Sequence, residues 1–273
     1  MPFKIPPPTS QYSKLTFPTP HILLVTLSRP KNLNCINSTG HAELHAIWEW
    51  MDEEPSLRVG IVTGEGRAFC AGADLKEWNN STQTSKPRAP MPPSGFGGLS
   101  RRTGKKPIIA AVNGLCLGGG CEMITNTDIV ISTERAFFGF PEVQRGVVAW
   151  AGALPRIVRT VGRQRAMEMV LTGRRVQARE AERWGFVNEV VDGEKGVVER
   201  AVEVAVQIAD NSPDAVIVSR EGVKMGWEGV GAEEGTRLIV EAWEKKLNAG
   251  ENIKEGLRAF VEKRKPQWSE SKL

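Results

Sequence analysis

The chain has 273 residues, of which 40% are hydrophobic and 25% are charged. This composition is that of a globular protein, and it excludes a collagen, a coiled-coil rod and a wholly disordered chain. The formal net charge of +4 is too small for the dense cationic surface of a nucleic-acid-binding protein, and it suits an anionic small molecule equally well. Apolar runs such as Ile108–Val112 have the length of strands, so we expect no membrane span.

The N-terminal part of the chain predicts a hairpin followed by a helix. Residues 1–11 are rich in proline, and we expect them to form a loose arm. Two strands are predicted at Tyr12–Phe17 and His21–Ser28. Ser38 is a suitable N-cap for a helix that runs to about Glu54, where a proline follows.

Continuous apolar runs then alternate with helical patterns. Buried strands are predicted at Leu57–Thr63, Pro107–Val112 and Asp128–Ser132. Strands that alternate with helices indicate an α/β fold with a largely buried sheet. We expect a core over residues 12–200.

Residues 201–273 are expected to form a helical C-terminal region. The helical pattern begins at Gly193, and one face carries Val197, Ala201, Val204 and Ile208. Later helices are predicted at Pro213–Trp227, Glu233–Leu247 and Ile253–Arg264.

A long connection between Asn79 and Lys106 is rich in Ser, Pro, Gly and basic residues, including Ser94–Gly98 and the pair Arg101-Arg102. A connection of this length inside a compact domain is usually either disordered or functional. We expect a mobile cover over a site.

The three histidines, His21, His41 and His45, limit the available chemistry. A Ser-His-Asp triad would have to recruit one of them. His41 and His45 are four residues apart, but Ala42 stands where a zinc-protease motif requires glutamate. A surface pair on an amphipathic helix is favoured, and no metal site is expected.

The four cysteines, Cys35, Cys70, Cys116 and Cys121, form no C-x-x-C motif and have apolar or glycine neighbours. We expect buried, reduced thiols.

Two glycine-rich segments have a backbone geometry that core packing alone would not require. Arg67–Lys76 and Val112–Glu122 each follow a predicted strand and open a helix. Free N–H groups at a helix N-terminus attract negative charge, either a bound phosphate or an oxyanion that forms during a reaction. Tight strand–helix packing is the alternative explanation for either segment alone.

These two segments, together with Phe138–Glu142, resemble the three signature blocks of the enoyl-CoA hydratase/isomerase (crotonase) family. The resemblance extends from about Tyr12 to Arg264. It implies an α/β fold, namely the ClpP-like spiral of β-β-α repeats with two nearly perpendicular sheets, and a helical C-terminal region that forms homotrimers, often paired as hexamers. It also implies an acyl-CoA thioester as substrate, with no further cofactor.

The resemblance assigns the reacting groups by their position within the blocks. The backbone amides of Ala73 and Gly119 would bind the thioester oxygen. Glu122 and Glu142 would be the catalytic pair of a hydro-lyase, in which Glu122 activates water and Glu142 protonates carbon. Removal of water from a 3-hydroxyacyl-CoA would use the same pair with exchanged roles. The alternative is that each glutamate only begins a helix.

For the CoA part of the substrate, the resemblance suggests Arg29, Ala71 and the segment Asp74, Leu75 and Lys76. Short-chain hydratases usually have a Pro-Gly pair at the positions of Ala149 and Trp150 in this chain. Its amide could hold the catalytic water and its indole could restrict the acyl group, or the indole could turn outward into a subunit contact.

Two other functions on the same fold remain as alternatives. A Δ3,Δ2-enoyl-CoA isomerase usually keeps only the later carboxylate, so Glu122 argues against it. An RNA-binding or scaffolding protein would interleave aromatic with basic residues, which this chain does not do. The chain resembles hydratases of fungal secondary metabolism.

The sequence ends in Ser271-Lys272-Leu273, the tripeptide that the peroxisomal import receptor reads. We therefore expect a peroxisomal protein, and we find no sequence feature of a nucleic-acid or membrane partner.

Overall fold

The computed structural model describes residues 3–85, 88–191 and 194–273. Its larger sheet has six strands, in the order β1 (Ser13–Thr19), β2 (Ile22–Leu27), β3 (Val59–Gly64), β5 (Ile108–Val112), β7 (Ile129–Thr133) and β10 (Glu189–Val191). The first pair is antiparallel, and the other neighbours are parallel. The predicted hairpin and the three predicted buried strands are confirmed.

A smaller sheet has four strands, in the order β4 (Ala68–Cys70), β6 (Leu115–Leu117), β8 (Phe137–Gly139) and β9 (Val176–Gln177). Strands β4, β6 and β8 are parallel to one another, and β9 is antiparallel to β8. The chain therefore alternates between the sheets: β3, β5 and β7 lie in the larger sheet, and the next strand lies each time in the smaller one.

Each of these strand pairs leads into a helical turn. After β4 comes α2 (Leu75–Thr84), after β6 comes α3 (Gly119–Ile124), and after β8 comes the 3-10 turn η3 (Pro141–Arg145). This is the spiral of β-β-α repeats that the family resemblance implied. Because β4, β6 and β8 are parallel neighbours, the three segments that follow them meet at one edge of the smaller sheet.

Helix α7 (Glu194–Ala209) covers the larger sheet. Its small buried residues Val197, Ala201 and Ala205 pack in one apolar cluster with Ile61 and Ile109. The predicted domain boundary between residues 200 and 201 falls inside this helix, whose buried residues on both sides of that position pack on the larger sheet. Gly193, where the helical pattern was expected to begin, lies outside the described residues.

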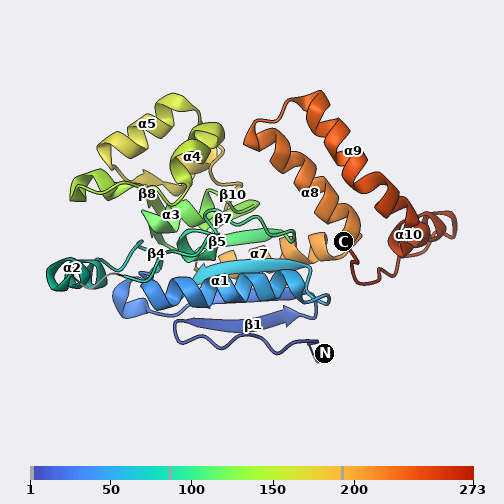
Figure 1. The fold of residues 1–273 in the computed structure, drawn as a ribbon, viewed down its shortest axis with the longest axis horizontal. Coiled ribbons are helices and arrows are strands. Elements are labelled where there is room, and N and C mark those ends of the chain that lie inside the picture. The colour runs from blue at the N-terminus through green and yellow to red at the C-terminus, as the bar shows by residue number, and fades with distance from the viewer. Residues whose placement is uncertain (1–2, 86–87, 192–193) are drawn as a thin grey trace.

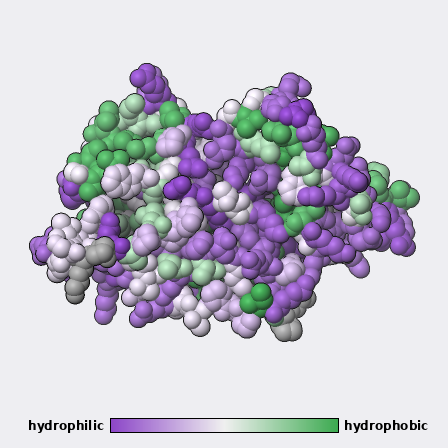
Figure 2. Space-filling view, in the orientation of Figure 1, coloured by the Kyte–Doolittle hydropathy of each residue, from purple (hydrophilic) through white to green (hydrophobic). Residues whose placement is uncertain are grey.

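The C-terminal helices α8 (Pro213–Glu228), α9 (Ala232–Ala249) and α10 (Glu251–Val261) lie together on one side of the molecule, orange to red in Figure 1. Helices α4 (Ala153–Val161) and α5 (Arg163–Thr172) lie on the other side, and α6 (Ala178–Arg183) follows β9. Hydrophobic residues are visible over both groups, with hydrophilic residues between them (Figure 2). Within the described ranges, no helix is both long and apolar enough to span a bilayer.

Helix α1 (Ser38–Glu53) begins one residue earlier than predicted. Its N-cap is Asn37, because the Asn37 side chain accepts the Gly40 N–H at 2.9 Å. The expectation of a surface histidine pair is wrong. His41 is buried and accepts the Gly97 N–H at 3.1 Å, and burial lowers its pKa to about 4.

The N-terminal arm is docked, so the prediction of a loose segment is wrong for the described residues 3–11. The Phe3 ring contacts Phe17 and Trp50, with centroids 4.7 and 5.3 Å apart. The Lys4 N–H donates to buried Glu54 at 2.9 Å. Buried aromatic contacts outweigh the local preference of the prolines.

The expected mobile cover over residues 79–106 is also wrong for most of its length. Residues 79–84 complete α2, and residues 94–100 are buried around the 3-10 turn η2 (Phe96–Gly98). The Trp48 indole donates to Gly97 O at 3.1 Å, and Asn126 donates to Leu99 O at 2.7 Å. Residues 86–87 lie outside the described chain.

Candidate active site

The two glycine-rich segments lie in contact at the edge of the smaller sheet. Gly72 has a φ of +98°, and a Cβ at this position would lie 3.1 Å from Leu117 O and 3.3 Å from the Gly119 nitrogen. Two features therefore require glycine at position 72: the positive φ of the backbone, and the close approach of Leu117 O and the Gly119 nitrogen. The packing brings the residue before Ala73 against the first turn of α3.

The amides of Ala73 and Gly119 have no acceptor among the described residues. The parallel bridge beside Ala73 uses the carbonyls of Gly72 and Ile36 and the N–H groups of Ile36 and Asp74. Gly119 is the first residue of α3, where an N–H group has no partner within the helix. The two amides are thus available to one negatively charged oxygen.

Glu122 lies in α3 with only 4% of its surface exposed. Its Oε2 atom accepts the Ala153 N–H at 3.2 Å. Burial raises the pKa of Glu122 to about 7, and the charge of Glu142 adds to this, while the amides of Ala151, Gly152 and Ala153 oppose it. A carboxyl group with this pKa can give or take a proton near neutral pH.

Glu142 lies in the first turn of η3, and its side chain reaches Gly118. A Cβ on Gly118 would be 2.8 Å from Glu142 Oε1. The Oε2 atom of Glu142 is buried without a hydrogen-bond partner in the described chain. Burial raises the pKa of this carboxyl group as well.

Glu122 and Glu142, the two predicted catalytic residues, therefore lie near each other, and both lie close to Gly118. The Glu122 N–H donates to Gly118 O at 2.9 Å, and Gly118 also contacts Glu142. Because each carboxylate raises the energy of the other, one ionised and one protonated carboxyl is the favoured state of the pair. Such a pair can take a proton from one atom of a ligand and donate one to another.

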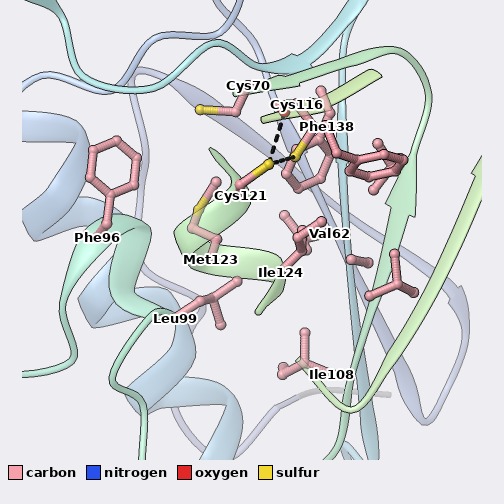
Figure 3. Close-up of a cluster of buried hydrophobic side chains, with 14 of the residues drawn as sticks. Val62, Cys70, Phe96, Leu99, Ile108, Cys116, Cys121, Met123, Ile124 and Phe138 are labelled. Atoms are coloured by element: carbon pink, nitrogen blue, oxygen red, sulfur yellow. Dashed lines mark hydrogen bonds between the residues drawn. The ribbon is translucent and has the colours of Figure 1, made fainter. Parts of the chain in front are cut away.

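A buried wall behind α3 was missed in the sequence. A Cβ on Gly119 would lie 2.4 Å from the Phe96 ring, so this ring covers the start of the helix. Figure 3 shows Phe96 and Leu99 on one side of α3, and Cys116 and Phe138 on the other. The unusual composition of residues 94–98 was the available signal, but it was interpreted as a loop.

The cysteines were predicted as buried, reduced thiols, and Cys35 departs from this because it is only partly buried. All four are free, and Cys70, Cys116 and Cys121 are buried. The Cys121 thiol donates to Cys116 O at 2.9 Å (Figure 3).

The residues suggested for CoA binding cluster around α2. The Arg29 guanidinium pairs with Asp74 at 2.8 Å and donates to Cys35 O at 2.7 Å. Asp74 is the N-cap of α2, where it accepts the N–H groups of Lys76 and Glu77. Arg29, Asp74 and Lys76 line one open groove.

Leu75 and Ala71 complete this region. Leu75 is 48% exposed beside the groove. The Ala71 N–H donates to Leu33 O at 3.0 Å, so only the Ala71 carbonyl could serve a ligand.

Trp150 turns outward, and 73% of its surface is exposed. Its N–H donates to Val148 O at 3.0 Å. The expectation that this amide holds a catalytic water is therefore wrong, because the tight turn after η3 already uses it.

Within the described residues, no group of three or more His, Cys, Asp or Glu could hold a metal ion.

The chain is similar to known proteins over almost its whole length. Residues 19–271 match the enoyl-CoA hydratase/isomerase family. The chain is 54% identical over 269 residues to the mevalonyl-coenzyme A hydratase sidH of Aspergillus fumigatus, covering 97% of this chain and 98% of that protein. It is 52% identical to the mevalonyl-coenzyme A hydratase of Beauveria bassiana over the full length of both.

Solved structures are similar as well. A crystal structure of an enoyl-CoA hydratase from Mycobacterium tuberculosis matches with a TM-score of 0.87 and 29% identity, over 96% of this chain and 100% of that chain.

Proposed function

Because the chain belongs to the enoyl-CoA hydratase/isomerase family, we propose that the site at the edge of the smaller sheet interconverts a 2-enoyl-CoA and a 3-hydroxyacyl-CoA. The protein is an acyl-CoA hydratase, a hydro-lyase. The observation that carries the assignment to this site is that Glu142 lies against Gly118, near enough for its charge to act on the Glu122 carboxyl group, beside two amides without acceptors in the described chain.

We propose mevalonyl-CoA as the 3-hydroxyacyl-CoA, in the synthesis of a siderophore. The support is the identity of 54% and 52% to two mevalonyl-coenzyme A hydratases, against 38% to a probable mitochondrial enoyl-CoA hydratase of Dictyostelium discoideum.

In this proposal, the amides of Ala73 and Gly119 stabilise the transition state. Removal of a proton next to the thioester carbonyl places negative charge on its oxygen. Two N–H groups that already point at this oxygen lower the barrier, and the loss of one such donor typically costs about 3–4 kcal/mol. No further cofactor is needed, because the thioester itself makes the neighbouring proton acidic.

The glutamates move the protons. In dehydration, ionised Glu142 takes the α-proton, and protonated Glu122 donates to the leaving hydroxyl group, so that water departs. Hydration reverses both steps. The raised pKa values of both groups support this division, because they allow one proton to be shared by the pair near neutral pH.

The test is an assay of purified protein with a panel of acyl-CoA thioesters that includes crotonyl-CoA, mevalonyl-CoA and a 3-enoyl-CoA. We expect hydration or dehydration, and no accumulation of isomer alone. Glu142→Gln and Glu122→Gln should each lower kcat at least about 100-fold, because each removes a general acid–base group. Calorimetry should find nearly unchanged binding of a CoA ester.

Glu244→Gln is the matched control, since this carboxylate is exposed on α9 and should leave kcat unchanged. Full activity in Glu142→Gln would remove this residue from the mechanism. Turnover of the 3-enoyl-CoA only would favour the isomerase.

We further propose that the chain forms homotrimers or hexamers through its C-terminal helices. Large apolar side chains on these helices are exposed in the single chain, among them Val223, Leu257, Phe260 and Val261. Such apolar surface is typical of subunit contacts.

A peroxisomal location, reached through the import receptor, is also a proposal, and Ser271-Lys272-Leu273 is its support. A fluorescent protein fused to the N-terminus should mark peroxisomes. Removal of residues 271–273 should move the fusion to the cytosol, whereas a change at exposed Lys254 should not. Continued peroxisomal location after the removal would contradict the proposal.

A further inference from the structure

Ser100 connects the two halves of the proposed site, although it lies outside all three signature segments. Its side chain is fully buried, at 0% exposure. The hydroxyl donates to Ala151 O at 2.6 Å and accepts the Phe96 N–H at 2.7 Å. One oxygen atom thus joins the turn η2 to the loop that precedes α4.

The contact with Ala151 determines the direction of a donor to Glu122. The Ala151 carbonyl and the Gly152 N–H belong to the same planar peptide unit and point to opposite sides of it. Ser100 holds the carbonyl side. The Gly152 amide is among the backbone groups that lower the pKa of Glu122, and the next amide, that of Ala153, donates to Glu122 Oε2 at 3.2 Å. Rotation of this peptide would turn the Gly152 amide away from Glu122.

The loop also packs directly on residues 100 and 101. Gly152 has a φ of +126°, and a Cβ there would lie 2.8 Å from Arg101 Cγ and 3.0 Å from Ser100 O. A Cβ on Gly95 would lie 2.3 Å from Ser100 Oγ. Glycines at both positions therefore allow the loop and the η2 segment to pack closely around Ser100.

The contact with Phe96 extends the connection to the oxyanion side. The Phe96 ring covers Gly119, whose amide is one of the two proposed donors. Ser100 therefore holds both the loop beside Glu122, through Ala151 O, and the turn η2, whose Phe96 ring covers the Gly119 amide.

We propose that Ser100 is a positioning residue of the hydratase, which keeps the backbone amides before α4 directed at Glu122 by holding the Ala151–Gly152 peptide. The inference rests on the proposed function of the glutamate pair. Ser100 touches neither substrate nor reacting atoms in this scheme, and it acts through the loop.

Several groups face Glu122 and could contribute to its titration. Glu142 lies beside it on η3, and Arg101 and Arg156 flank Gly152. Cys121 precedes Glu122 in α3, and its thiol contacts that of Cys116. His41 stacks on the far side of Phe96, with ring centroids 4.5 Å apart. None of them changes in the variants below.

The test is Ser100→Ala, with two readouts. Amides that bind the ionised carboxylate favour it, so their loss should raise the pKa of Glu122 by about one unit, from about 7. Infrared difference titration, with Glu122→Gln subtracted, measures this pKa without substrate. In the assay, the acidic limb of kcat/KM for hydration should move upward equally, so that kcat/KM at pH 7 falls about 5-fold.

Two further variants keep the test decisive. Ser100→Cys keeps a side chain of the same shape but donates weakly, so it should shift the pKa less, in the same direction. Thr63→Val is the control, because it removes another buried hydroxyl that donates to a backbone carbonyl, Ala111 O, at 2.8 Å. It should lower the melting temperature and leave the pKa of Glu122 unchanged.

The outcomes are distinguishable from a failure of the proposed function. An unchanged pKa in Ser100→Ala and Ser100→Cys, with lost thermal stability only, would make Ser100 merely structural and overturn the inference. A wild-type protein that turns over no thioester would overturn the function, while the infrared titration would still report on Ser100.

Discussion

Gly118 occupies the position where both glutamates meet. Its φ of +54° is unfavourable for any residue with a Cβ, and its carbonyl accepts the first hydrogen bond of α3. Glu142 Oε1 fills the space in which a side chain would stand. The same glycine therefore begins the helix that carries one carboxylate and leaves room for the other.

Gly118→Ala should damage both stability and activity. The left-handed backbone alone costs about 1–2 kcal/mol in unfolding free energy, and the added methyl group displaces Glu142. We expect kcat to fall at least about 10-fold, because a displaced acid–base group loses much of its contribution. Urea unfolding and the hydratase assay measure the two effects.

Gly185→Ala is the control that separates backbone strain from displacement of the Glu142 side chain. Gly185 also has a positive φ, +77°, but no atom lies within 4 Å of a Cβ there. It should lower stability by a similar amount and leave kcat unchanged. Equal kcat in Gly118→Ala and the wild type would show that Glu142 can move without loss of function.

The site residues that lie within the signature segments could be predicted from the sequence. Glu122 and Glu142 were predicted as a pair, and the structure brings them together, because each follows a strand of the same parallel set. The amide of Trp150 could not be judged in this way. Whether it is free depends on a tight turn after η3, and no local pattern indicates that turn.

At the scale of the element, Asp74 joins α2 to the rest of the site. Burial alone would raise the pKa of Asp74, but hydrogen bonds from Arg29 and from the amides of Glu77 and Lys76 lower it overall. The ionised Asp74 carboxylate therefore stabilises the folded state at pH values above the ordinary pKa of an aspartate. This contribution is lost as the pH falls through the lowered pKa of Asp74.

Asp74→Ala should lower the unfolding free energy by about 1 kcal/mol more than Asp74→Asn, since only alanine removes the N-cap. Both variants leave Arg29 without its carboxylate, so both should raise KM for the CoA ester. Urea unfolding at neutral pH and steady-state kinetics measure these effects.

Ser212→Ala provides the comparison for the cap. Ser212 is the N-cap of α8 and accepts the Ala215 N–H at 3.4 Å. It should cost stability without a change in KM. Equal unfolding free energies for the two Asp74 variants would contradict the assigned role of the cap.

Elements differed in how well they could be predicted. Strands β2, β3, β5 and β7 were found because each is a largely apolar run of five or six residues, and β1 was found as the hairpin partner of β2. Short β10 was not predicted. Strands β4, β6 and β8 have three residues each, too few to show a period. Only the resemblance to a family indicated a second sheet.

At the scale of the whole molecule, the errors share one cause. The arm at residues 3–11 and the segment at residues 94–100 both have the composition of loops, with proline, glycine and serine. The arm is nevertheless docked and the segment is buried, because distant partners contact them: Trp50 and Glu54 for the arm, and α1 and α3 for the segment. Contacts between parts far apart in the chain are not visible in local composition.

The division of the reacting groups among three successive repeats has a consequence for how such enzymes diverge. The loop after β8 can lengthen or shorten while the amides after β4 and β6 keep their places. Natural selection can in this way alter which acyl chain is accepted, one repeat at a time, on an ancestral enolate-forming scaffold that stays constant.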